Sequence, residues 1–290
     1  MIRSLLFAPG NRPDLLKKFP RSEADGFVID LEDGTPEREK AAARRELPGV
    51  VSYLREQRVT GLIFVRTNEP ASPHSAADID AALETDVDGL MIPKLGEVAD
   101  VQRFGRALAA AEQRGSGKRL HLIGIIESMA GVLAAAQLAA SGEDHLSALC
   151  FGGEDFITDL GGRRTAGGLE VLYARSQVVL AARAAGLEAI DQVVVDIRDD
   201  QQFRQDAEAG RNLGYTGKMC LLPRQVTLAN EVFSPTAEEV ERSRRLIEAY
   251  DATTVQGRGV MEFEGKMIDP PLLKRARAVL EIASRIHPKP

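Results

Sequence analysis

The sequence predicts a (β/α)8 barrel that carries a small helical extension at its C-terminal end. Eight short apolar runs alternate with amphipathic, helix-like stretches over about 230 residues, a size typical of one such barrel. Each run is apolar almost throughout, as in parallel strands that are buried on both faces. The first run continues into Ala-Pro-Gly-Asn-Arg-Pro and lacks the G-x-G-x-x-G of a dinucleotide-binding fold. One barrel is therefore favoured over the main alternative, a doubly wound sheet.

The predicted strands are rich in Leu, Ile, Val and Phe, and most stop at Pro, Gly or a charged residue. The helical stretches between them have recognisable ends. Thr35 before Pro36 is typical of a helix N-terminus, and Gly186 suits the end of a helix over 169–185. The predicted strands are residues 4–8, 26–31, 62–65, 89–92, 120–126, 148–151, 192–195 and 217–222.

The strand–helix alternation stops after Pro235. Thr236 and Glu239 have the spacing of a capping box and open a predicted helix over 237–250. A glycine-containing segment over 253–267 and a last helix over 270–286 complete the chain. Because this part is too small for a substantial core, we expect a barrel domain over 1–235 and an appended extension over 236–290.

Composition excludes several classes of protein. The 290 residues include 37 Lys and Arg against 43 Asp and Glu, a net charge of −6 that argues against a nucleic-acid binder. No apolar run has the ~20 residues of a membrane-spanning helix. The N-terminal residues lead directly into the first strand without a signal-peptide pattern, and Cys150 and Cys220 form no C-x-x-C pair. These features predict a cytoplasmic protein with no membrane association.

Charged side chains follow the predicted strands at their carboxyl ends, which is where barrel enzymes have their active sites. Several are carboxylates with no His or Cys cluster nearby, a set that suits Mg²⁺. Glu127 and Asp155, on neighbouring strands, form the best pair of ligands, although solvated loop tips explain the pattern equally well from spacing alone. The charged residues are Asp30, Glu32, Asp33, Arg66, Lys94, Glu127, Glu154, Asp155 and Asp196.

Basic residues crowd the first strand–helix unit, at Arg3, Arg12, Lys17 and Lys18. They form either a solvated helix face or an anchor for the phosphates of a large anionic ligand, since Arg and Lys suit phosphate oxygens.

Nine short motifs, taken in order, resemble the citrate lyase β-subunit-like branch of the HpcH/HpaI aldolase superfamily, and within it the citramalyl-CoA and malyl-CoA lyases. Each motif is weak alone, but their order and their places at strand ends make the set specific. They include Asp-Leu-Glu-Asp-Gly, Ile-Glu-Ser-Met-Ala-Gly-Val and Phe-Gly-Gly-Glu-Asp-Phe. The motifs are residues 3–11, 30–34, 65–68, 92–94, 126–132, 151–156, 172–175, 214–218 and 265–271.

The resemblance implies a TIM barrel that forms homotrimers or trimer-based hexamers. It implies that Glu127 and Asp155 bind Mg²⁺, and that Glu32 and Asp33 hold metal-bound waters. Arg66 would bind the thioester oxygen, and Asp269 would act as acid and base on a C-terminal lid that reaches a neighbouring subunit's site. The predicted cations for substrate and coenzyme A binding are Arg66, Arg3, Arg12, Lys17 and Lys94.

The implied activity is Mg²⁺-dependent, reversible cleavage of citramalyl-CoA or malyl-CoA to acetyl-CoA and a 2-oxo acid. Three alternatives remain: a citrate lyase β-subunit acting on a citryl-acyl-carrier-protein thioester, a pyruvate aldolase for free acids, and a non-catalytic CoA-ester-binding protein. The long C-terminal lid disfavours the aldolase. One departure is Leu222, which stands where relatives usually carry His before Pro223. Leucine cannot replace the polar contact that a histidine makes.

Overall fold

The computed structural model describes residues 1–115, 117–254 and 260–286. The chain divides into two compact units, Met1–Glu231 and Val232–Pro290. The division falls within the last helix of the barrel, a few residues before the predicted boundary at 235. None of the helices in the described ranges is long and apolar enough to cross a membrane.

The first unit is the predicted (β/α)8 barrel. Its eight strands are parallel, each pairs with the next along the chain, and β8 closes the ring against β1. All the carboxyl ends of the strands therefore meet at one rim. The strands are β1 (Ser4–Pro9), β2 (Gly26–Asp30), β3 (Leu62–Arg66), β4 (Gly89–Ile92), β5 (His121–Ile126), β6 (Leu146–Phe151), β7 (Glu188–Asp191) and β8 (Gly217–Cys220).

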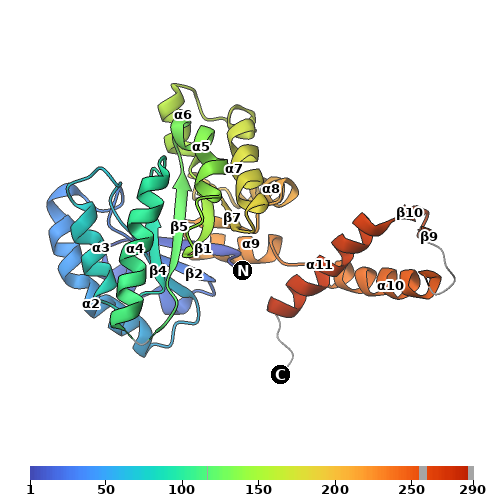
Figure 1. The fold of residues 1–290 in the computed structure, drawn as a ribbon, viewed down its shortest axis with the longest axis horizontal. Coiled ribbons are helices and arrows are strands. Elements are labelled where there is room, and N and C mark those ends of the chain that lie inside the picture. Colours follow the sequence, from blue (N-terminus) through green and yellow to red (C-terminus); the bar gives the residue numbers. More distant parts are fainter. Residues whose placement is uncertain (116, 255–259, 287–290) are drawn as a thin grey trace. The chain divides into compact units, whose positions relative to one another are not determined.

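Helices follow the strands and surround the barrel (Figure 1). The longer ones are amphipathic: α4, for example, buries Val101, Phe104 and Leu108 at helical spacing. The helices are α1 (Pro13–Leu16), α2 (Lys40–Glu56), α3 (Ser75–Leu83), α4 (Val98–Arg114), α5 (Met129–Ala139), α6 (Gly153–Leu160), α7 (Leu172–Ala184), α8 (Asp200–Leu213) and α9 (Pro223–Val232), with 3-10 turns η1 (Phe19–Arg21), η2 (Glu37–Glu39) and η3 (Leu169–Val171).

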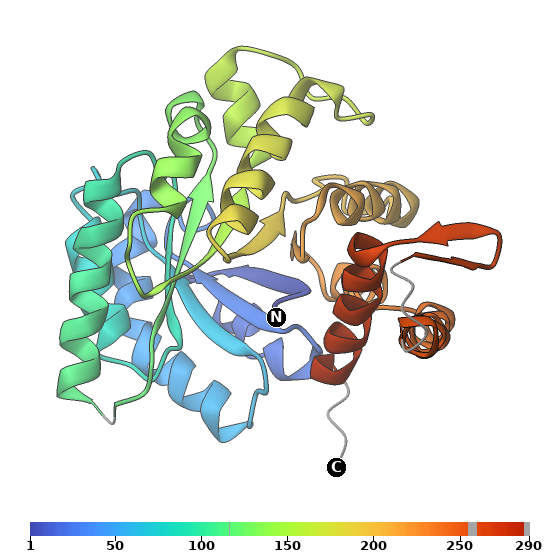
Figure 2. The ribbon, with the colours of Figure 1, turned by 45° about the vertical axis from the view of Figure 1, so that its right-hand side comes forward.

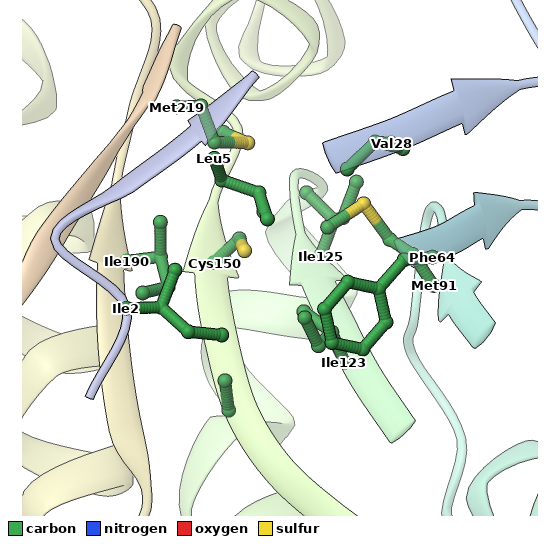
Figure 3. Close-up of a cluster of buried hydrophobic side chains, with 11 residues drawn as sticks. Ile2, Leu5, Val28, Phe64, Met91, Ile123, Ile125, Cys150, Ile190 and Met219 are labelled. Atoms are coloured by element: carbon green, nitrogen blue, oxygen red, sulfur yellow. The ribbon is translucent and has the colours of Figure 1, made fainter. Parts of the chain in front are cut away.

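Apolar side chains from all eight strands fill the barrel interior (Figure 3). Phe64 and Ile125 lie in this cluster, and neither is more than 1% exposed. Truncation of a buried phenylalanine to alanine typically costs about 3–5 kcal/mol, so the cluster forms a rigid floor beneath the rim. The cluster is Ile2, Leu5, Val28, Phe64, Met91, Ile123, Ile125, Ala148, Cys150, Ile190 and Met219.

The seventh strand is the one element that the apolar pattern misplaced. The prediction chose the valine-rich run 192–195, whereas β7 is Glu188–Asp191. Asp191 is fully buried on the outer side of the strand, where Arg175 and Lys218 pair with its carboxylate. A buried charge is stable when it is paired, but its partners lie far along the chain and give no local signal.

The second unit is a helical hairpin with a small apolar cluster of its own. Helices α10 (Ala237–Thr254) and α11 (Pro270–Ile286) pack together, and strands β9 (Met261–Phe263) and β10 (Lys266–Ile268) form a hairpin directly before α11 (Figure 2). The predicted capping box is confirmed, since Thr236 and Glu239 exchange hydrogen bonds of 2.8 and 3.1 Å. Residues 255–259, part of the predicted glycine-containing segment, lie outside the described residues.

Candidate active site

Three charged side chains continue the inward-facing rows of the barrel above its apolar floor. Each of the three lies two positions after a side chain of the apolar cluster, on the same strand or directly beyond its end. Asp30 follows Val28, Arg66 follows Phe64, and Glu127 follows Ile125. Side chains two residues apart on a strand point to the same face. The alternation therefore places these three charges together at the carboxyl-end rim.

Asp30 clamps the guanidinium of Arg66. Arg66 donates from Nε to Asp30 Oδ1 at 2.8 Å and from Nη2 to Oδ2 at 2.7 Å. Its Nη1 lies 2.9 Å from Oε2 of Glu32, and its Cζ lies 5.6 Å from the centre of the Phe7 ring. Burial alone would lower the pKa of Arg66, but the charge and hydrogen bonds of Asp30 outweigh it and raise that pKa.

The clamp leaves Arg66 with donors to spare. A guanidinium carries five N–H groups, and Asp30 takes two of them. Within the described residues, Oε2 of Glu32 is buried and makes no hydrogen bond, although it lies close to Nη1. N–H groups on Nη1 and Nη2 therefore remain available to an incoming carbonyl or carboxylate oxygen.

Asp30 also shapes the loop that presents Glu32. Its carboxylate accepts hydrogen bonds from the backbone N–H groups of Glu32 and Gly34, both at 2.9 Å. A Cβ on Gly34 would lie 2.4 Å from Oδ2 of Asp30, so only glycine fits there. The Asp-Leu-Glu-Asp-Gly motif is thus a turn built around one aspartate.

Carboxylates crowd the next part of the rim. Glu127 is buried, and its Oε1 accepts a 2.7 Å hydrogen bond from the backbone N–H of Lys94. Burial, followed by the neighbouring charge of Glu32, raises the pKa of Glu127 to about 8, and Asp155 adds to the effect. Burial also raises the pKa of Glu32, whose Oε1 lies 3.0 Å from Nζ of Lys94.

Asp155 lies in the first turn of α6, directly after β6, and is half-buried. Gly152 allows Glu127 to approach this turn, because a Cβ at position 152 would lie 2.4 Å from Oε2 of Glu127. Asp155 is close enough to Glu127 for its charge to contribute to the raised pKa of Glu127.

The carboxylate set fits a magnesium ion. Mutual repulsion and burial hold Glu127 partly protonated, and a bound cation would relieve both effects. Within the described residues, no group of three His, Cys, Asp or Glu side chains is arranged to hold a metal. Mg²⁺ needs only one or two carboxylates besides water and substrate oxygens. Oε2 of Glu32 contacts Nη1 of Arg66 at 2.9 Å but makes no hydrogen bond with any described residue, so it is suited to accept one from a metal-bound water.

Residues from the surrounding helices support the rim, and sequence reasoning missed them. Lys40, buried on α2, donates to the backbone oxygens of Leu31 and Glu32, both at 2.9 Å, and to Asn68 at 2.6 Å. Asn68 in turn donates to Asp78 on α3 at 2.6 Å. A lysine and an aspartate on amphipathic helices look solvated in sequence, so no local signal marks them.

The structure separates Arg3 from the other predicted cations. Arg3 precedes β1 at the amino-terminal end of the barrel, where its guanidinium pairs with Asp25 at 2.8 Å. Parallel strands put the start of β1 at the end opposite the rim, so Arg3 lies away from the other predicted substrate-binding residues. Arg12 and Lys17 lie after β1 in exposed positions. Arg12 forms an ion pair with Asp14, and the ammonium group of Lys17 lies over a tyrosine ring of α2.

The remaining predicted residues are placed individually. Asp33 is exposed beside Glu32. Asp269 belongs to the second unit, where its Oδ1 accepts a 3.2 Å hydrogen bond from the N–H of Leu272 at the start of α11. Leu222 follows β8 and is half-buried, and its N–H lies 3.3 Å from Oε1 of Gln225.

Comparison with known proteins gives consistent matches over almost the whole chain. Residues 3–223 match the family described as HpcH/HpaI aldolase/citrate lyase. A citrate lyase subunit beta-like protein of Deinococcus radiodurans is 44% identical over 289 residues, covering 97% of this chain and 96% of its own. The mitochondrial citramalyl-CoA lyase of Homo sapiens is 31% identical over 300 residues, covering 99% and 87%.

A solved structure is similar along the full length. It is the CitE protein of Mycobacterium tuberculosis in complex with magnesium, acetoacetate and coenzyme A. The TM-score is 0.78 at 29% identity, with 97% of each chain covered. The likeness extends beyond the barrel to the C-terminal helices.

Proposed function

This chain belongs to the HpcH/HpaI aldolase/citrate lyase family, and we propose that it is a magnesium-dependent carbon–carbon lyase that cleaves a malyl-type thioester of coenzyme A. One observation carries the proposal: an arginine whose side chain is 13% exposed, with spare N–H groups, lies beside a crowded set of buried carboxylates at the barrel rim. The products are acetyl-CoA and a 2-oxo acid.

Glu127 and Asp155 are the proposed magnesium ligands. When bound, Mg²⁺ supplies a Lewis acid that polarises the hydroxyl and carboxylate oxygens of the substrate. Glu32 and Asp33 are proposed to hold water at the ion. The fixed backbone donor at Lys94 orients Oε1 of Glu127, which leaves its other oxygen directed to the β6 side of the rim.

Arg66 is the proposed anchor for the thioester oxygen. The hydroxyl proton passes to solvent, and its O–H electron pair forms the carbonyl of the 2-oxo acid as the C–C bond breaks. The electron pair of that C–C bond moves onto the thioester, whose oxygen becomes an enolate oxygen. The spare N–H groups of Arg66 face that developing charge, and Asp30 holds the guanidinium rigid. One such prepositioned donor is typically worth about 3 kcal/mol of transition-state stabilisation.

Asp269 is the proposed acid that protonates the enolate carbon, completing acetyl-CoA. In the reverse direction the same carboxylate removes a proton from the methyl group. Its place at the start of α11 fixes the side chain through the 3.2 Å hydrogen bond from Leu272. We propose that Asp269 serves the active site of a neighbouring subunit in a homotrimer or trimer-based hexamer.

An apolar outer surface supports the proposed oligomer. Leu133 on α5 is 78% exposed and Tyr173 on α7 is 72% exposed, and their helices pack together. Large exposed apolar side chains on neighbouring helices are typical of a contact surface. The surface comprises Met129, Leu133, Leu160, Leu169, Leu172, Tyr173 and Leu180.

The coenzyme A portion is proposed to contact the basic residues that lie on the rim side of the barrel. Arg12 and Lys17 are exposed after β1 and are candidates for its phosphates, as is Lys94 beside Glu32. Leu222 presents an apolar side chain near the end of β8 and is proposed to favour a methyl-bearing substrate, such as citramalyl-CoA, over one with a second carboxylate.

A panel of substrates tests the proposal. Malyl-, citramalyl-, β-methylmalyl- and citryl-CoA are compared by kcat/KM with Mg²⁺ and after EDTA treatment. We expect Mg²⁺-dependent turnover of at least one malyl-type thioester, and weaker turnover of citryl-CoA. The name of the Deinococcus relative favours a second candidate, a citrate lyase β-subunit. Turnover of a citryl-acyl-carrier-protein thioester, with none of the free CoA thioesters, would support that candidate.

A further inference from the structure

Lys94 adopts a backbone conformation that side-chain-bearing residues rarely take. Its φ is +48°, and the only other described non-glycine residues with positive φ are Arg58 and Glu264. Glu264 lies in the tight turn between β9 and β10, and Arg58 lies just beyond the end of α2, two places where such a φ is ordinary. Lys94 instead follows Pro93 at the end of β4, on the active-site rim, where strained residues often have a functional cause.

The left-handed conformation turns one backbone N–H into the barrel mouth. The N–H of Lys94 donates to Oε1 of Glu127 at 2.7 Å, whereas the next N–H, from Leu95, returns to the sheet and donates to Ile125 at 3.0 Å. Within the described ranges, Lys94 provides the one hydrogen bond to the carboxylate of Glu127. The orientation of that buried carboxylate therefore depends on the φ of Lys94.

The side chain of Lys94 makes a separate contact. Its Nζ lies 3.0 Å from Oε1 of Glu32 and 3.9 Å from Oε2 of Glu69, and the side chain is 35% exposed. Ion pairs that reach solvent contribute little, because water and salt replace them readily. The buried backbone hydrogen bond has no such replacement.

We propose that Lys94 is a positioning residue that acts through its backbone: its left-handed conformation, rather than its ammonium group, orients Glu127 to bind a divalent cation. The proposal rests on the proposed function, which makes Glu127 a ligand of Mg²⁺. It separates two properties that a lysine combines, a charge and a backbone conformation.

Substitutions at position 94 separate these two properties. Glycine adopts positive φ freely and asparagine does so more readily than other side chains, and neither carries a charge. Arginine keeps the charge and, like lysine, can be held at positive φ by its surroundings. Valine removes the charge and, being β-branched, opposes positive φ most strongly.

The experiment measures Mg²⁺ binding by titration calorimetry on the full chain without substrate. We expect Lys94→Gly, Lys94→Asn and Lys94→Arg to bind Mg²⁺ within about threefold of the wild-type Kd, and Lys94→Val to bind about tenfold more weakly or worse. Arg58→Val is the matched control, since it strains an exposed left-handed residue away from the rim. It should lower the Tm, as Lys94→Val does, but leave the Mg²⁺ Kd unchanged.

Three results would overturn the proposal. One is a Kd that follows charge, with Lys94→Arg binding normally and both Lys94→Gly and Lys94→Asn weakened. Another is a folded Lys94→Val that binds Mg²⁺ as tightly as Lys94→Asn does. If Lys94→Val does not fold, Lys94→Ala replaces it in the comparison, and the proposal then requires Lys94→Ala to bind Mg²⁺ more weakly than Lys94→Asn. The third is a wild-type protein that binds no Mg²⁺, which alone would also refute the magnesium site of the proposed function.

Discussion

Replacing Glu127 by glutamine tests whether this residue is a buried carboxylate kept for a cation. Glutamine has nearly the same shape and can still accept the hydrogen bond from the N–H of Lys94, but it cannot ionise. In metal-free protein, the substitution removes the cost of burying a carboxylate next to Glu32 and Asp155. We therefore expect Glu127→Gln to stabilise the metal-free fold at neutral pH.

The magnitude follows from the pKa of Glu127, about 8 in the folded protein against 4.5 for an unperturbed side chain. Because the folded state holds its proton more tightly, the contribution of this group to stability is complete below pH 4.5 and declines as the pH rises to about 8. At pH 7 the loss covers about 2.5 pH units at about 1.4 kcal/mol each, or roughly 3.5 kcal/mol. Burial of the glutamine amide reduces the gain, so about 2 kcal/mol is the expected stabilisation.

Thermal unfolding of EDTA-treated protein between pH 5 and pH 9 measures the effect. The Tm of Glu127→Gln should exceed that of the wild type by several degrees at pH 7, and the difference should widen from pH 5 to 8 and then level off. Mg²⁺ should raise the Tm of the wild type but not that of the variant. Glu208→Gln, at an exposed position on α8, is the matched control and should parallel the wild type. Parallel curves for Glu127→Gln and the wild type would refute the reasoning.

Three further predictions concern catalysis and assembly. Arg66→Ala should lower kcat/KM by about a hundredfold or more, and a near-normal rate would contradict the role of Arg66. Asp269→Asn should lower turnover while circular dichroism stays unchanged, and mixing Asp269→Asn with Arg66→Ala subunits should restore part of the activity. If mixed subunits stay inactive while exchange is demonstrated by labelling, Asp269 does not act across subunits. Leu133→Asp should reduce the oligomer mass measured by light scattering, whereas Glu208→Gln, at an exposed position on α8 outside that surface, should leave the mass unchanged.

Much of the barrel could be predicted because its signals are local. Seven of the eight apolar runs coincide with strands, and the two-residue alternation along each strand brings Asp30, Arg66 and Glu127 to one rim. The exception, β7, ends in Asp191, whose burial depends on Arg175 and Lys218. A pattern that scores apolarity has no way to recognise a strand stabilised by distant charges.

The contacts of the site depended on closure of the barrel. The sequence by itself determined the fold class, the places of seven of the eight strands and the type of chemistry, since periodicity and motif order are short-range properties of the chain. Only the tertiary structure decided that Asp30 clamps Arg66, that Lys94 directs its backbone N–H to Glu127, and that Arg3 lies at the opposite end. These contacts join residues 22 to 36 positions apart, and their geometry exists only once parallel strands have closed into a ring.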